Sequence, residues 1–145
     1  LKVSTFIELS DALYVTGDYE KSKSFAEEAK TLSKNLNFNK GLSSALVNIA
    51  KTYYETGEYD LAMENCIEAK LIRETINDKK GVGRIWNTIG AIYTIQGDFV
   101  KALESCLKAA KILESVNDKT ALGSCYGSIG NIYILFAIHA ASRCD

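Results

Sequence analysis

The sequence contains no proline, so no position in it is barred from an α-helix by a missing N–H. It has one histidine, His139, and no Cys-x-x-Cys pair, so the ligand spacing of a zinc or iron–sulfur site is lacking. The sequence also has no excess of positive or negative residues, because 17 basic and 18 acidic residues give a net charge of −1. Nucleic-acid-binding surfaces need clustered Lys and Arg. We therefore predict no metal ligands and no nucleic-acid partner.

Targeting and catalytic motifs are also lacking. No basic and apolar segment near the start resembles a signal peptide, and no apolar run reaches the length of a membrane span. No nucleophile elbow, phosphate loop or acid–base pair is present. The first residue is Leu1 rather than Met, so we expect the chain to be part of a longer protein. We expect a cytoplasmic chain that is not an enzyme, with no catalytic residue, no cofactor and no membrane partner.

What the sequence does contain is a pattern that returns every 40 residues. Gly17, Gly57 and Gly97 are each followed by an acidic and then an aromatic residue. A fixed period in this range is typical of stacked repeats, in which each unit buries its apolar face against its neighbours. The sequence predicts one domain, 1–145, made of repeats 1–40, 41–80 and 81–120 and a partial repeat 121–145. The apolar and small positions that recur are Ile49, Ala50, Tyr53, Ala62, Cys66 and Ala69, and then Ile89, Gly90, Tyr93, Ala102, Cys106 and Ala109.

Glycine and aspartate mark the helix ends within each repeat. Glycine accepts the left-handed conformation that ends a helix, and the carboxylate of a following Asp accepts hydrogen bonds from the free N–H groups of the next helix. Asp78 and Asp118 are predicted N-caps for the same reason. The equivalent positions of Cys66 and Cys106 predict small buried residues in a reducing compartment. The predicted helices include Lys2–Thr16, Tyr19–Leu36, Tyr59–Ile76 and Phe99–Val116, and the last helix is expected to continue through Ile132–Ala141.

These residues resemble the tetratricopeptide repeat, whose 34-residue signature has W-x2-L-G-x2-Y in its first helix and two spaced alanines in its second. Trp86-x2-Ile89-Gly90-x2-Tyr93 carries the match, followed by Ala102 and Ala109. The proline that usually closes a repeat is replaced by Lys34, Glu74 and Glu114, which lets the second helices run longer. The 40-residue period resembles the extended variety found in Pins-type spindle adaptors and in bacterial signalling proteins. The resemblance implies an all-α solenoid of antiparallel helix pairs, about three and a half repeats with seven helices.

The aromatic residues of the motif are expected in the core, and the last repeat is expected to be incomplete. The packing positions hold Trp86, Tyr93, Tyr53 and Tyr133. Beyond residue 137 no turn and no second helix follow, so Ile129, Ile132 and Phe136 would lack cover. An uncovered apolar patch favours a homodimer through this end. The alternative is that the chain was cut at an arbitrary boundary.

The resemblance also implies a concave surface lined by the first helix of each repeat, with Asp11, Tyr14 and Glu55 among the inward positions. Amide side chains can pair with a peptide backbone, Tyr supplies flat contact area, and Lys and Arg can hold a carboxylate. Each assignment has an ordinary alternative, since exposed Asn, Lys and Arg are commonly only solvated. The predicted peptide-binding residues are Asn48, Lys51, Tyr54, Arg84, Asn87 and Asn131.

The sequence therefore predicts a scaffold for protein–protein interaction that binds a peptide or protein segment on its concave face. One alternative is a sensor or regulatory input domain of a signalling protein such as a kinase, a cyclase or a transcription regulator. Another is a self-assembly module.

Overall fold

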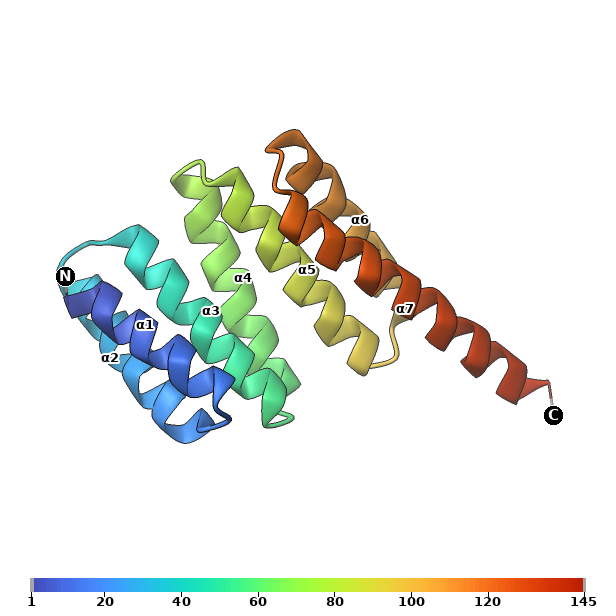
Figure 1. The fold of residues 1–145 in the computed structure, drawn as a ribbon, viewed down its shortest axis with the longest axis horizontal. Coiled ribbons are helices and arrows are strands. Elements are labelled where there is room, and N and C mark those ends of the chain that lie inside the picture. The colour runs from blue at the N-terminus through green and yellow to red at the C-terminus, as the bar shows by residue number, and fades with distance from the viewer. Residues whose placement is uncertain (1, 145) are drawn as a thin grey trace. The chain divides into compact units, whose positions relative to one another are not determined.

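The computed structural model describes residues 2–144, and they form seven α-helices with short connections. The helices are α1 (Lys2–Val15), α2 (Tyr19–Asn35), α3 (Asn39–Glu55), α4 (Tyr59–Thr75), α5 (Lys79–Ile95), α6 (Phe99–Ser115) and α7 (Lys119–Arg143) (Figure 1). No strand occurs between residues 2 and 144. The all-α fold and the seven helices are confirmed, and each predicted helix end lies within one residue of the observed one.

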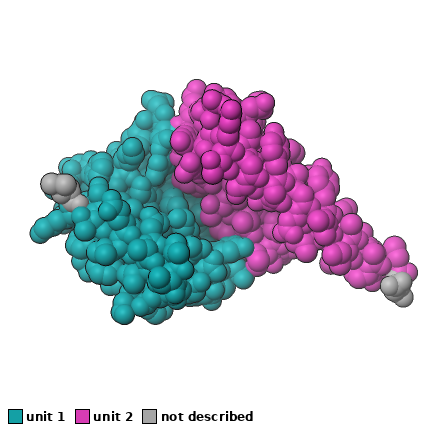
Figure 2. Space-filling view, viewed as in Figure 1, with its two compact units in different colours: residues 1–78 teal, residues 79–145 magenta. Residues whose placement is uncertain are grey.

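The chain divides into two compact units (Figure 2). The first, residues 1–78, holds α1 to α4, and the second, residues 79–145, holds α5 to α7. The division falls in the connector between the second and third predicted repeats. A single domain over 1–145 stays a prediction of the sequence, and the two units are described separately below.

Every turn between successive helices uses one residue with a positive φ angle. Gly17, Gly57 and Gly97 have φ of 84°, 83° and 79°, as the sequence predicts for glycines that end helices. After Gly17, the N–H of Asp18 donates to the carbonyl oxygen of Leu13 at 2.9 Å. The N–H of Gly17 donates a second hydrogen bond to the carbonyl oxygen of Tyr14 at 3.1 Å. These two hydrogen bonds define a Schellman motif.

The connectors between repeats use asparagine in the same role, which the sequence analysis did not anticipate. Asn37, Asn77 and Asn117 have φ of 52°, 57° and 55°. Asparagine tolerates the left-handed region better than other residues that carry a Cβ. The hydrogen bonds around each Asn repeat the Schellman pattern, so glycine and asparagine alternate along the chain as helix-ending residues.

Aspartates cap helices that follow these turns. Asp18, Asp98 and Asp118 each accept a hydrogen bond from the backbone N–H three residues later. Glu58 and Phe38 occupy equivalent positions and make no side-chain cap bond. The cap at Asp118 confirms its predicted role.

Small residues allow the paired helices to approach closely. A Cβ added to Gly90 of α5 would lie 2.4 Å from Sγ of Cys106 in α6, closer than any normal contact. Cys66 and Cys106 are buried, and burial raises the pKa of their thiols to about 12 and about 11. Both cysteines are therefore neutral packing residues, as predicted.

The burial of the apolar side chains of α7 differs from what the sequence predicted for the incomplete last repeat. Ile132 is only 2% exposed, because it packs with Ala102 and Cys106 of α6, and Ile129 packs against the same cluster. The expectation that these two residues lack cover is wrong. Phe136 is largely exposed, as expected, although its ring lies 6.2 Å from that of Phe99. Tyr133, expected in the core, is 58% exposed, so that expectation is wrong as well.

α7 is also long and apolar enough, by length and composition alone, to cross a bilayer. The sequence analysis missed this because it looked for an unbroken apolar run, whereas glycine and serine interrupt the apolar residues of α7. One such helix is weak evidence for a membrane span. The side chains of Cys125 and Ile132 are buried against α6, whereas only 11% of the apolar window of α7 is buried within the molecule.

Candidate peptide-binding surface

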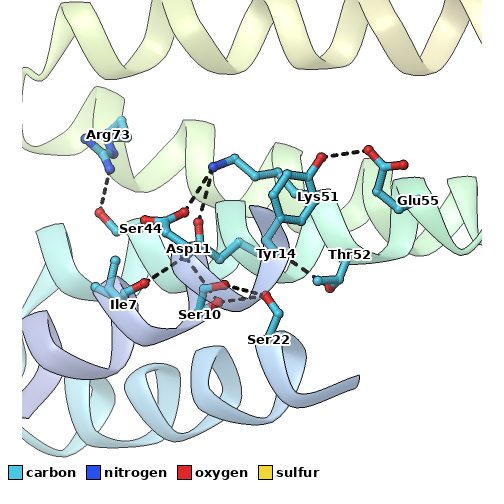
Figure 3. A network of polar contacts seen from close by, with 11 residues as sticks. Ile7, Ser10, Asp11, Tyr14, Ser22, Ser44, Lys51, Thr52, Glu55 and Arg73 are labelled. Carbon is cyan, nitrogen blue, oxygen red and sulfur yellow. Dashed lines mark hydrogen bonds and ion pairs between the residues drawn. The ribbon is translucent and has the colours of Figure 1, made fainter. Parts of the chain in front are cut away.

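Five polar and aromatic side chains lie together on the first helices of unit 1. We call this group, Asp11 and Tyr14 of α1 with Lys51, Tyr54 and Glu55 of α3, the α1–α3 surface. Figure 3 shows Asp11, Tyr14, Lys51 and Glu55 of this group. Lys51 Nζ lies 3.4 Å from Asp11 Oδ1 and 5.7 Å from the centroid of the Tyr14 ring. The Tyr14 hydroxyl donates to Glu55 Oε1 at 2.7 Å. All five side chains reach solvent at least in part.

Asn48 lies beneath this surface and is 5% exposed. Its Nδ2 donates to Ile7 O at 3.4 Å and to Ser10 Oγ at 3.3 Å, which ties α3 to α1. Its Oδ1 accepts from Lys51 Nζ at 3.5 Å. The amide group is thus engaged inside the unit at both ends, and the geometry gives Asn48 a role in positioning Lys51.

A buried serine pair supports the same region from below. Ser22 donates to the carbonyl oxygen of Ser10 at 2.8 Å, and the two hydroxyl oxygens lie 3.1 Å apart. Ser22 replaces the first alanine of the motif, and Ser10 replaces the motif glycine. Both serines are fully buried, and their mutual hydrogen bonds satisfy groups that would otherwise be costly to bury. The first repeat therefore departs from the motif in a paired way.

Tyrosines frame one end of the surface. The ring centroids of Tyr14 and Tyr19 lie 5.7 Å apart, and those of Tyr54 and Tyr59 lie 5.9 Å apart. Burial, followed by the nearby Glu55 carboxylate, raises the pKa of both Tyr14 and Tyr54. These phenols stay neutral at physiological pH and offer hydrogen-bond donors beside flat apolar rings.

The predicted residues of unit 2 form a separate group. Arg84 Nε donates to Asp118 Oδ2 at 2.8 Å, and this hydrogen bond is the main cause that lowers the pKa of Asp118. Asn87 Nδ2 donates to Ser124 Oγ at 3.4 Å, and Asn131 is exposed on α7. A shallow hollow of about 210 Å³ has Arg84, Asn87, Thr120, Ala121 and Ser124 as its lining.

The structure thus brings Asn48, Lys51 and Tyr54 together in unit 1. Arg84 and Asn87 line one hollow in unit 2, and Asn131 does not line it. Between residues 2 and 144, no three His, Cys, Asp or Glu side chains are arranged to hold a metal ion.

Comparison with known proteins agrees with this geometry. Residues 42–79, which contain α3 and α4, match the sequence model of the tetratricopeptide repeat. This segment of the chain is therefore similar to one tetratricopeptide repeat. Outside the matched segment, α2, α5 and α6 have the same length of 17 residues as α3 and α4, and the same turns recur between the helices.

Solved structures share the fold at low sequence identity. Aspartyl phosphate phosphatase F from Bacillus subtilis has a TM-score of 0.87 and 22% identity, over 98% of this chain and 38% of its own. BtubC (BKLC) from P. vanneervenii has a TM-score of 0.80 and 16% identity, over 93% of this chain and 56% of its own. A signal transduction ATPase with a tetratricopeptide repeat sensor, PH0952 from Pyrococcus horikoshii, has a TM-score of 0.78 and 18% identity, over 95% and 22%.

These likenesses establish the tetratricopeptide-like solenoid fold and nothing finer. The chain spans only part of each of these proteins, between 22% and 56% of their length. The search of curated proteins gave no significant match.

The pairing of charged residues between repeats was not predicted from the sequence. Asp11 and Lys51 occupy equivalent positions of successive repeats, 40 residues apart, and so do Tyr14 and Tyr54. Equivalent positions of stacked repeats lie side by side. The opposite charges of Asp11 and Lys51, separated by one 40-residue period, could therefore have predicted their ion pair.

Arg73 of α4 is a further residue that the sequence analysis did not select. It forms an ion pair with Asp78 and donates to the hydroxyl groups of Ser43 and, at 2.8 Å, Ser44. In the next repeat the corresponding carboxylate, Asp118, pairs with Arg84 instead. Arg84 occupies the position equivalent to Ser44, so the arginine lies on the first helix there. Asp78 and Asp118 thus each form an ion pair with an arginine. Because the two arginines occupy different positions in their repeats, a motif with one fixed arginine position would not identify both pairs.

Proposed function

We propose that the chain binds a protein or peptide segment on the α1–α3 surface. The observation that carries this proposal is the partly exposed group of Asp11, Tyr14, Lys51, Tyr54 and Glu55 above a buried hydrogen-bond network. Tetratricopeptide repeats in general serve protein–protein interaction, which agrees with this assignment.

Lys51 is the proposed contact for an acidic group of the ligand. Its partner Asp11 is about half exposed, and exposed ion pairs contribute only about 0–1 kcal/mol. A ligand carboxylate can therefore compete with Asp11 at small cost. Asn48 holds the Lys51 amine on this face, and the rings of Tyr14 and Tyr54 offer apolar contact beside it.

The residues of unit 2 are proposed as a second contact group. Arg84 holds Asp118 through Nε while its side chain stays 54% exposed, and Asn87 lies in the same hollow. Asn131 is proposed as an outlying contact on α7. We also propose a cytoplasmic location and a chain without catalytic activity of its own, since buried free thiols suit a reducing compartment.

The test is a selection of displayed random peptides against the chain, followed by affinity measurements on the selected peptides. Lys51→Met should weaken binding by about tenfold. Lys101→Met is a matched control, because Lys101 also makes an ion pair at 3.4 Å and lies 5.6 Å from a tyrosine ring, on a second helix. It should leave affinity within about twofold. Equal effects of the two substitutions, with unchanged melting temperatures, would reject the surface.

Two other functions stay predictions. A sensor input to a signalling enzyme has only a fold-level parallel in the ATPase that carries a tetratricopeptide repeat sensor. Self-assembly is favoured by a specific observation on α7, which is argued next.

A further inference from the structure

Among residues 2–144, no helix covers the side of α7 that is equivalent to the α6-covered side of α5. In α5, the positions Gly83, Trp86, Gly90 and Tyr93 pack against α6. The equivalent positions of α7, 40 residues later, are Gly123, Tyr126, Gly130 and Tyr133. We call these four residues, together with Ile134, the open face of α7.

The contrast between the two helices is large at every equivalent position. A Cβ added to Gly83 would lie 2.9 Å from Leu113, whereas one added to Gly123 would meet no atom within 4 Å. Gly90 and Gly130 differ in the same way. Tyr126 is 57% exposed, and Ile134, which replaces Thr94, is 60% exposed. The open face therefore has the residues of a helix-covered surface without the cover.

We propose that the open face of α7 binds the same face of a second copy of this chain. The first reason is complementarity. Gly123, Gly127 and Gly130 have the spacing of Ala102, Cys106 and Ala109 in α6, the helix that covers α5. α7 therefore combines large side chains at the positions where α5 has them with small residues at the spacing found in α6. Antiparallel pairing about Gly130 places Tyr133 of one copy opposite Gly127 of the other, and Tyr126 opposite Ile134. One surface meets itself, as in a two-fold dimer.

The second reason is area and charge. Together with Ile138, the exposed apolar side chains of the open face offer roughly 500 Å² per copy, since a full aromatic side chain buries about 150–250 Å². Two copies together remove roughly 1,000 Å² from water, which reaches the size of specific interfaces. From residue 120 to residue 142 there is no Asp, Glu, Lys or Arg. No like charges therefore oppose each other when two α7 helices pair.

The experiment measures the mass of the 145-residue chain by sedimentation equilibrium and light scattering across the micromolar range. We expect a shift from the chain mass of 15.9 kDa to twice that value as concentration rises. Tyr133→Glu should raise the dissociation constant by at least about tenfold, because it buries a charge in the pairing. Gly130→Leu should do the same by separating the helices, and the monomer has room for the added side chain.

Leu107→Glu is the matched control. Leu107 is an apolar residue of α6 that is 52% exposed and lies off the open face. It should leave the dissociation constant within about twofold. Circular dichroism checks that every variant stays helical, so that a loss of pairing is not a loss of folding.

Cross-linking tests the register. In a Cys144→Ser background, Gly130→Cys should form a disulfide between copies, because a residue at the two-fold axis lies opposite itself. Asn131→Cys, one position along the helix, should not. Equal cross-linking of both variants would reject this register.

Other occupants are distinguishable outcomes. A chain that stays monomeric across the range overturns the proposal, as does a dimer that Tyr133→Glu and Gly130→Leu leave intact. Monomers that float with phospholipid vesicles, and lose this with Tyr133→Glu, would assign the face to a membrane instead. Monomers that capture a peptide of residues 99–115 would assign it to a separate helix resembling α6.

Discussion

At the residue scale, identical amino acids in this chain have opposite energetic roles. Gly90 lies where α5 and α6 nearly touch, and an added Cβ would clash with Cys106. Gly130 occupies the same motif position in α7, with open space around it. Glycine is required by packing at the first position, whereas at the second it only lowers helix propensity.

Alanine at these two glycines should therefore shift stability in opposite directions. Gly90→Ala should destabilise the chain by about 1–3 kcal/mol, because Cys106 must move. Gly130→Ala should stabilise it by about 0.5–1 kcal/mol through helix propensity. Urea unfolding followed by circular dichroism, at concentrations where the chain is monomeric, measures both. Two shifts of the same sign would contradict the packing described for α5 and α6.

Two buried serines give a second comparison at this scale. The hydroxyl of Ser33 is buried and has no hydrogen-bond partner among residues 2–144, whereas that of Ser22 is bonded to Ser10. Ser33→Ala should raise the free energy of unfolding by about 1 kcal/mol by removing an unpaired polar group. Ser22→Ala should lower it by about 1 kcal/mol. Thermal unfolding of both variants decides, and a loss for Ser33→Ala would imply a partner for its hydroxyl group.

At the element scale, helix ends are set by local chemistry, which explains why the sequence predicted them well. Gly17 predicts the end of one helix and Asp18 predicts the start of the next. The predicted helix end and helix start both lie within one residue of the observed ones. Asn117 was harder to identify, because asparagine also occurs in ordinary loops. Its period of 40 residues with Asn37 and Asn77 was the available signal.

The left-handed asparagines lead to a prediction about the connectors. Asn117→Ala should cost about 1–2 kcal/mol, because alanine pays the steric cost of φ near 55°. Asn117→Gly should be neutral or slightly stabilising, since glycine adopts this conformation freely. The midpoint of urea unfolding compares the two variants. If alanine were tolerated as well as glycine, the connector would not have the conformation described.

The connector carboxylate Asp118 should make stability depend on pH. Its pKa in the folded chain is lowered, first by the hydrogen bond from Arg84 and further by the N–H of Ala121. A lowered pKa stabilises the fold above the unfolded-state pKa of about 3.9 and ceases to do so as pH falls through the folded-state value. The stability difference between the wild type and Asp118→Asn should therefore be full above about pH 4 and shrink at lower pH.

Arg84→Met supplies the control for this prediction. Without the guanidinium group, the pKa of Asp118 should rise towards its usual value, so the acid-dependent part of the stability should become smaller. Unfolding by urea at a series of pH values measures it. An unchanged pH profile in Arg84→Met would show that this ion pair does not act on Asp118.

At the scale of the whole molecule, burial was the property that the sequence predicted least well. Tyr93 and Tyr133 hold the same motif position, yet Tyr133 is mostly exposed, because none of the described helices covers that side of α7. Asn48 was predicted as a ligand contact, and its burial depends on Ile7 and Ser10 of another repeat. A period identifies equivalent residues, but exposure also depends on which neighbours are present.

The division into two units leads to a prediction about which pieces fold alone. In residues 1–78, the small residues of α4 cover α3, and the hydrogen bonds of Asn48 join α3 to α1. Within this unit α1 packs on α2, α2 on α3 and α3 on α4. A fragment of residues 1–78 should be helical and should unfold cooperatively in urea, with a free energy of about 4 kcal/mol for so small a unit.

A fragment of residues 1–58 is the matched comparison, because it keeps α1 to α3 and removes α4. Leu46 and Ile49, which are buried in the whole chain, would then lose the helix that covers them. A repeat that cannot bury its apolar face does not fold by itself, so this fragment should lose cooperative unfolding and most of its helical signal. Circular dichroism during urea titration separates the two outcomes. If the fragments behaved alike, closure of the core by α4 would not be what stabilises the first unit.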